Sequence, residues 1–139
     1  MVVIFLYSTK DAVESTEDSY TVGMTIGRIF IPGFAERSAA EQLAFAEKAD
    51  HPVRKTAHAA EYAVLGFLTA GTIFGFSNVG SYPQKILVAW LIATFYAATD
   101  EVHQLFVPGR SGQISDVCLD SAGVLLGVAI FALLTNRKE

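Results

Sequence analysis

Ionisable side chains gather at the end of a strongly apolar stretch, in the segment 100–110 that reads DEVHQLFVPGR. A charged group inside a membrane-spanning helix costs free energy, so such groups commonly serve a function. Carboxylates beside a histidine can act as general acid and base, because burial and like-charged neighbours separate their pKa values. The same side chains can hold a divalent cation, since carboxylates supply oxygen ligands and histidine a nitrogen. The segment is therefore a candidate for acid–base chemistry or cation binding.

A second polar cluster stands just before the first long apolar stretch, and its members share or border one helix face because they recur at three- and four-residue spacing. These residues are Arg54, Lys55, His58, Glu61 and Tyr62. The cationic residues suggest a third chemistry, the binding of a phosphate or carboxylate on an envelope lipid or peptide, which Arg grips through two parallel hydrogen bonds. Arg54, Lys55 and Arg110 would form this anion clamp.

The next apolar helix carries its polar residues on one face as well. This face consists of Tyr96, Asp100, His103 and Gln104. Glu101 is expected to point partly away from it. Simpler roles remain open, since Tyr96 and Gln104 can be hydrogen-bonded packing residues and His103 an interface residue.

The last apolar helix begins with two carboxylates one turn apart, Asp116 and Asp120. Asp116 can alternatively cap the helix together with Ser115, because carboxylates favour the first turn. The same stripe continues with Gly123 and Gly127. Glycines four residues apart predict a close contact with another helix inside a membrane.

Composition places the chain among membrane proteins. Of its 139 residues 52% are hydrophobic and only 17% are charged, and its mean hydropathy is positive. The ten Lys and Arg residues are scattered and the net charge is -4, which gives no electrostatic footprint for a nucleic acid. The single cysteine, Cys118, excludes an intramolecular disulfide and a thiolate metal site and is interpreted as a packing residue.

Uncharged runs of 23, 14 and 16 residues occupy 62–84, 86–99 and 121–136. A hydrocarbon core of about 30 Å needs about 20 helical residues, so the two shorter runs must draw neighbouring polar residues into the membrane. We predict transmembrane helices at 56–76, 85–106 and 115–134. Residues 1–7 are too short to span and are expected to be the end of a truncated first span; a segment that dips into the membrane interface is the alternative. Residues 15–49 are expected to form two amphipathic helices that lie on the membrane and roof the site; a solvated connector is the alternative.

These helices would carry their apolar faces at two groups of positions, namely Val22, Ile26, Ile29 and Phe30, and Ala39, Leu43 and Ala46.

The predicted fold is a single all-α domain, residues 1–139: an integral membrane bundle of three complete transmembrane helices, a partial N-terminal one and an amphipathic helical connector. Successive spans run antiparallel, so the three polar clusters meet at one side of the bilayer. The catalytic candidates are His58, Glu61, Asp100 and Glu101. The substrate-binding candidates are Arg54, Lys55, Tyr62, His103, Gln104, Arg110, Asp116 and Asp120.

At these residues the chain resembles the VanZ-like family of bacterial membrane proteins. The residues that carry the resemblance are Ile4 to Ser8, Arg54-Lys55, His58, Glu61-Tyr62, Leu65-Gly66, Asp100-Glu101, His103-Gln104, Phe106 to Arg110, Asp116, Asp120, Gly123 and Gly127. The namesake of the family is associated with low-level resistance to the glycopeptide antibiotic teicoplanin. The resemblance thus implies a role at the cell envelope and names no reaction.

Together these features predict a pocket that binds or modifies an envelope lipid, a cell-wall precursor or a glycopeptide. The alternatives are a metal-assisted membrane hydrolase or transferase, with a divalent cation as cofactor, and a non-catalytic binding or structural subunit. The distribution of positive charge gives little information on which side of the membrane the site faces. Seven Lys and Arg lie on the side of the site and three on the other, but three of the seven belong to the site itself. The family resemblance favours a site facing outward from the bacterial cytoplasmic membrane.

Overall fold

The computed structural model describes residues 12–76, 80–107 and 113–135, and the predicted partial span 1–7 lies outside them. Every regular element in the described ranges is helical, which confirms the all-α prediction. In chain order these elements are α2 (Ala12–Phe30), the short 3-10 helix η1 (Phe34–Glu36), α3 (Ala39–Phe76), α4 (Tyr82–Gln104) and α5 (Ile114–Thr135).

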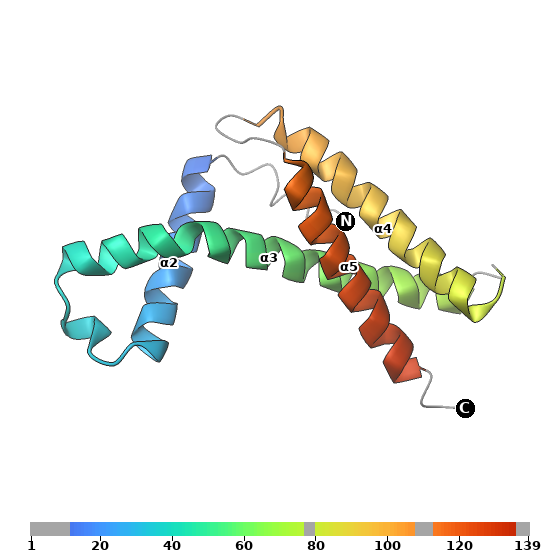
Figure 1. Ribbon diagram of the computed structural model, residues 1–139, viewed down its shortest axis with the longest axis horizontal. Coiled ribbons are helices and arrows are strands. Elements are labelled where there is room, and N and C mark those ends of the chain that lie inside the picture. Colours follow the sequence, from blue (N-terminus) through green and yellow to red (C-terminus); the bar gives the residue numbers. More distant parts are fainter. Residues whose placement is uncertain (1–11, 77–79, 108–112, 136–139) are drawn as a thin grey trace.

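The helices form two groups that share α3 (Figure 1). One group, which we call the arm, consists of α2, η1 and residues 39–54 of α3, and α2 crosses this half of α3. The other group, which we call the bundle, consists of residues 55–76 of α3 together with α4 and α5. The two groups meet near residue 55, where the first polar cluster lies.

Helix α3 is longer than the sequence suggested, because the second amphipathic helix and the predicted span 56–76 are one helix of 38 residues. Its start is fixed by a capping box, in which the Ser38 N–H donates to Glu41 Oε2 at 3.0 Å and the Glu41 N–H donates to Ser38 Oγ at 3.3 Å. Pro52 lies inside the helix and has no N–H to donate. The helix nevertheless continues, and the Thr56 hydroxyl donates to the Pro52 carbonyl at 2.7 Å.

Helices α4 and α5 lie close to their predicted positions. Helix α4 begins at Tyr82 rather than at 85, because Pro83 fits the first turn and the Ser81 N–H donates to Gln84 Oε1 at 2.7 Å. It ends at Gln104, and α5 extends from Ile114 to Thr135.

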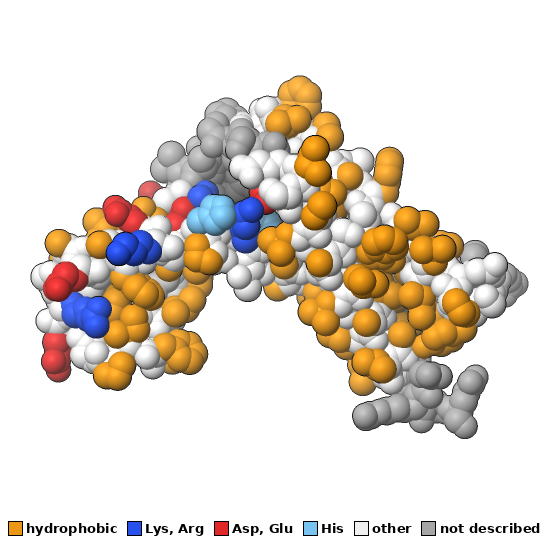
Figure 2. Space-filling view, in the orientation of Figure 1, with side chains coloured by type: hydrophobic (Ala, Val, Ile, Leu, Met, Phe, Trp, Pro, Cys, Tyr) orange, Lys and Arg blue, Asp and Glu red, His pale blue; other side chains and the backbone are white. Residues whose placement is uncertain are grey.

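The bundle buries small side chains and exposes large ones. Its buried core consists of Tyr62, Leu65, Ala70, Ala89, Ala93, Ala97, Val124 and Val128. Its exposed large hydrophobic residues include Leu68, Leu87, Leu91, Phe95, Leu126 and Leu133. Figure 2 shows this apolar surface over the bundle, with charged side chains gathered on the arm and at the junction. A surface of this kind suits a lipid environment.

Within the described residues, α5 alone is both long enough and apolar enough along its length to cross a membrane. Only 28% of its most apolar 18-residue window is buried, whereas the core helix of a soluble protein buries most of such a window. The apolar stretch of α4 ends in the charged residues Asp100 and Glu101.

Glycines bring α3 and α5 into backbone contact, as the sequence predicted. A Cβ atom at Gly123 would overlap the Ala59 carbonyl oxygen, and one at Gly127 would overlap the Ala63 carbonyl oxygen. Gly66 of α3 makes the reciprocal approach to the Val124 backbone. This close packing sets the spacing of the two helices that carry most of the pocket.

Helix α2 turns its small residues, not its apolar ones, toward α3. Ser19, Gly23 and Gly27 are buried, and Gly23 lies against Ala46. The Ser19 hydroxyl donates to the Asp50 carboxylate of α3. The residues of the predicted apolar face, which are Val22, Ile26, Ile29 and Phe30, are exposed. This face is therefore available to a membrane surface.

Candidate functional site

A small pocket lies between α3, α4 and α5 at the junction with the arm. Its volume is about 30 Å³, which is room for about two water molecules. The residues that line it are Lys55, His58, Glu101, Gln104, Asp116, Leu119 and Asp120. The structure thus brings together predicted site residues from all three apolar helices. No described residue of α2 lines the pocket, and α2 packs on α3.

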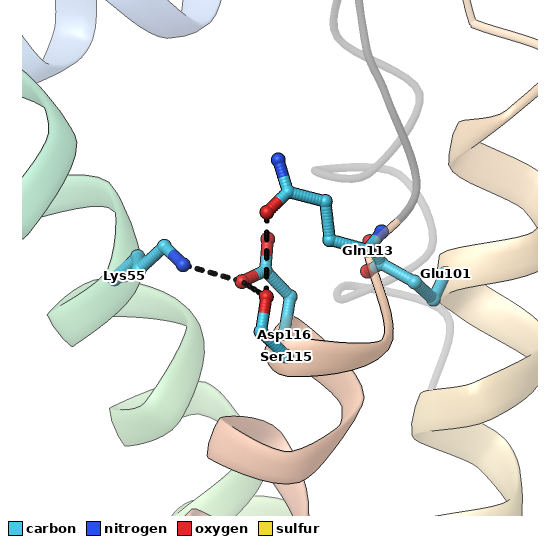
Figure 3. Close-up of polar contacts among 5 residues, drawn as sticks. All are labelled: Lys55, Glu101, Gln113, Ser115 and Asp116. Carbon is cyan, nitrogen blue, oxygen red and sulfur yellow. Dashed lines mark hydrogen bonds and ion pairs between the residues drawn. The ribbon is translucent and has the colours of Figure 1, made fainter.

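One wall of the pocket is a polar chain that joins α3 to the start of α5 (Figure 3). Lys55 Nζ donates to Asp116 Oδ1 at 2.5 Å, and both side chains are about 30% exposed. The Ser115 hydroxyl lies 3.3 Å from Asp116 Oδ1 and from Gln113 Oε1. Asp116 stands in the first turn of α5, where a carboxylate also interacts favourably with the helix dipole.

Glu101 lines the opposite wall, and it points in a different direction from Asp100, as expected, but into the pocket. The residue is only 6% exposed, and its Oε1 accepts a hydrogen bond from the Gln113 N–H at 2.7 Å. The physical reason is that α4 contacts two helices. Asp100 faces Tyr62 of α3, whereas Glu101 faces the start of α5, so two adjacent positions of α4 are buried.

Tyr62 and Asp100 form a buried hydrogen bond between α3 and α4. The Tyr62 hydroxyl donates to Asp100 Oδ2 at 3.0 Å, and both residues are almost completely buried. The Gln104 side-chain amide lies 3.5 Å from the same oxygen, at the limit of a hydrogen bond. Neither Tyr62 nor Asp100 lines the pocket, so this pair supports the site from behind.

Asp120 is the most deeply buried carboxylate that lines the pocket, at 3% exposure. Its Oδ1 atom is buried and has no hydrogen-bond partner within the described part of the chain. Buried carboxylate oxygens normally accept hydrogen bonds. Asp120 therefore presents an acceptor that the described protein groups do not fill.

Other predicted site residues lie outside the pocket. Arg54 Nη2 donates to Asp50 Oδ2 at 2.7 Å, and the same carboxylate accepts the Ser19 hydroxyl of α2. Glu61 and His103 are partly buried and do not line the pocket. Arg110 lies outside the described residues. Of the predicted anion clamp, Arg54 and Lys55 are thus already bound to carboxylates of the protein.

Three residues with contacts at or beside the site were not predicted from the sequence. Gln113 donates its backbone N–H to the pocket residue Glu101, a contact that no side-chain pattern signals. Leu119 could have been found, because it lies three residues after Asp116 on the same helix. Asp50 lies four residues before Arg54, which is the spacing of a helical ion pair. Cys118, interpreted as a packing residue, is exposed.

Within residues 12–76, 80–107 and 113–135, no group of three His, Cys, Asp or Glu side chains is arranged to bind a metal ion. The pocket offers carboxylates, an imidazole and an ammonium group instead. Such a set can bind a polar group and exchange protons with it.

Comparison with protein families supports the resemblance found in the sequence. A family model described as VanZ/LLP1 matches residues 1–135. Searches of curated proteins and of solved structures found no match. The family match covers every residue of the pocket.

Proposed function

Because this chain belongs to the VanZ/LLP1 family, we propose that it is a multi-pass membrane protein whose pocket binds the polar head of an envelope amphiphile. Its complete spans are residues 56–76 of α3, α4 and α5. The exposed large hydrophobic residues on all three helices, together with an interior of alanine and glycine, support this assignment. In this arrangement α2 lies at the membrane surface through its exposed apolar face.

The observation that carries the proposal is the pair of buried carboxylates, Glu101 and Asp120, in a pocket at the end of an apolar bundle. Ionisable groups at membrane depth are costly and mark binding or transport sites. His58 and Lys55 line the same pocket, so the site combines an acid, a base and a cation.

The size of the pocket limits what enters it. A volume of about 30 Å³ admits only the tip of a head group, comparable to about two water molecules. The remainder of the ligand then lies outside the pocket. An amphiphile meets this requirement, because its chains can lie along the apolar flank of the bundle while one polar group enters.

Turnover is the second candidate function, because His58 and Glu101 line one pocket and could act as base and acid. Binding and turnover differ in their products. Lipids and cell-wall precursors extracted from cells with and without the protein should have identical masses if it only binds. A new mass that disappears in a His58→Ala strain would establish an enzyme.

The proposal is tested through teicoplanin susceptibility in a bacterial host that expresses the chain, since the family resemblance links it to this phenotype. His58→Ala and Glu101→Gln should abolish the protection. The matched controls are His51→Ala and Glu47→Gln, which change exposed residues of the same types on α3 and should leave it intact. Equal membrane levels of all four variants must be verified by immunoblot. Unchanged protection in both pocket variants would refute the site.

Orientation is tested with single cysteines at Ser81 and Gln113, both of which are exposed, in a background that lacks the exposed Cys118. We propose that the pocket faces outward. A membrane-impermeant thiol reagent added to intact cells should then label position 113 and leave position 81 unmodified. The reverse labelling pattern would place the pocket in the cytoplasm.

A further inference from the structure

Asp120 brings an unfilled hydrogen-bonding position to the pocket. The residue lines the pocket and is only 3% exposed. Its Oδ1 atom is buried and has no hydrogen-bond partner among the described residues. A buried carboxyl oxygen normally has such a partner, and leaving it unpaired costs free energy. A group that enters the pocket can supply the missing hydrogen bond.

Two other buried carboxylates differ from Asp120 in this respect. Asp100 also has an unpartnered Oδ1 atom within the described residues, but the Tyr62 hydroxyl donates to its Oδ2 atom at 3.0 Å, and Asp100 does not line the pocket. Glu101 lines the pocket, and its Oε1 atom accepts the Gln113 N–H at 2.7 Å. Asp120 is therefore the side chain at which a ligand in the pocket gains a new hydrogen bond.

The group that pairs with Asp120 must suit either form of the carboxyl group. The ionised form only accepts hydrogen bonds, whereas the protonated form donates through its O–H and still accepts. A hydroxyl both donates and accepts, so it can pair with Asp120 in either form. An ammonium group only donates and a phosphate ion only accepts, so each can fill only one of these two roles.

We propose that the pocket binds a hydroxyl group, such as the terminal alcohol of a lipid head, through a hydrogen bond with Asp120. This inference rests on the amphiphile-binding function proposed above and specifies its ligand. A volume of about 30 Å³, comparable to about two water molecules, holds the hydroxyl oxygen and the carbon that bears it. Leu119 also lines the pocket and gives that carbon an apolar contact. Lys55 has three N–H donors, of which Asp116 accepts one.

The test compares two lipids that differ only at the hydroxyl group. The full-length protein is purified in a detergent that has no hydroxyl groups and is offered either dioleoylglycerol or its O-methyl ether. Native mass spectrometry counts the bound lipid. We expect about tenfold greater retention of the free alcohol, which is the effect of one hydrogen bond to a buried carboxyl group. This comparison uses the unaltered protein and does not depend on the folding of any variant.

Two substitutions of Asp120 separate hydrogen bonding from charge. Asp120→Asn removes the charge but keeps a donor and an acceptor, so it should keep the preference for the free alcohol. Asp120→Leu has a similar branched shape without polar atoms and should erase the preference. The control Glu47→Leu changes an exposed carboxylate of α3 and should keep it. Loss of the preference in Asp120→Asn as well would overturn the proposed hydrogen bond.

The outcomes separate this inference from the function on which it rests. Equal retention of the two lipids, still lowered in Glu101→Gln or His58→Ala, overturns the hydroxyl and leaves amphiphile binding intact. Glycerol is offered without lipid, and saturation-transfer NMR detects its binding. Glycerol binding that Asp120→Leu removes supports the hydroxyl with a soluble alcohol as ligand, and its absence beside lipid retention assigns the ligand to the membrane. Lipid retention that no pocket variant changes overturns both proposals, as does a failure to bind either lipid or glycerol.

Discussion

The bundle and the arm share α3 but differ in which side chains they bury and which they expose. In the bundle, alanines and valines fill much of the interior, large apolar side chains face outward, and the Tyr62–Asp100 hydrogen bond is buried. In the arm, α2 meets α3 through Ser19, Gly23 and Gly27, and its exterior mixes charged and apolar residues. The bundle is therefore suited to the membrane interior and the arm to its surface.

This difference explains why the pocket lies at the junction. The free-energy cost of burying a carboxylate is reduced where closely packed helices supply hydrogen-bond partners, as Tyr62 does for Asp100. The proposed polar ligand would in addition need access from the membrane surface, where the arm begins in the proposed arrangement. The end of the bundle that adjoins the arm would meet both conditions.

The largest expected effect contrasts glycines of the two regions. Gly127→Ala would push a methyl group into the Ala63 carbonyl and should destabilise the protein by about 1–3 kcal/mol or more. Gly23→Ala in the arm meets Ala46 and Ala49 no closer than 3.4 Å and should be nearly neutral. Thermal unfolding in detergent, followed by circular dichroism, measures both. Equal losses in the two variants would contradict the proposed contrast in packing.

A smaller effect contrasts two ion pairs. Lys55–Asp116 joins α3 to α5, whereas Arg54–Asp50 lies within one turn of α3. Double-mutant cycles with Lys55→Gln and Asp116→Asn, and with Arg54→Gln and Asp50→Asn, should give coupling energies of about 0.2–1 kcal/mol, because all four side chains remain partly solvated. We expect the larger value for the pair that joins two helices. A larger coupling within α3 would mean that Lys55 does not hold α5.

The smallest effect is confined to the arm and depends on pH. Two hydrogen bonds lower the pKa of Glu41 from 4.5. The larger contribution comes from the Ser38 hydroxyl and the smaller from the Ser38 N–H, both of which donate to the Glu41 carboxylate. The stability from this cap is present above pH 4.5 and is lost as the pH falls through the lower folded pKa. The NMR shift of the Ser38 amide should titrate with a midpoint below 4.5, and Glu41→Gln should remove the titration. A midpoint at or above 4.5 would refute the cap.

Local patterns predicted the bundle well. Helical spacing identified the polar faces that meet at the pocket, and the spacing of Gly123 and Gly127 predicted the close contact with α3. These features could be predicted because a side chain's helix face depends only on its position along that helix.

Features that depend on contacts between different helices could not be predicted from the spacing of residues along one helix. Glu101 is buried because α5 begins beside it, and the Gln113 contact runs through the backbone. The continuity of α3 across Pro52 was missed because proline usually ends or bends a helix. Helix α2 packs against the turn before Pro52, where Ser19 donates to Asp50, and such tertiary packing supplies most of a helix's stability in a protein.

The unbroken course of α3 has a mechanical consequence. A helix of 38 residues is about 57 Å long at about 1.5 Å per residue, roughly twice the hydrocarbon thickness of a bilayer. In the proposed membrane arrangement, the end of α3 outside that layer carries the arm, and no loop separates it from His58 or Lys55. A change in the membrane surface that tilts the arm would then move both pocket residues through one continuous helix.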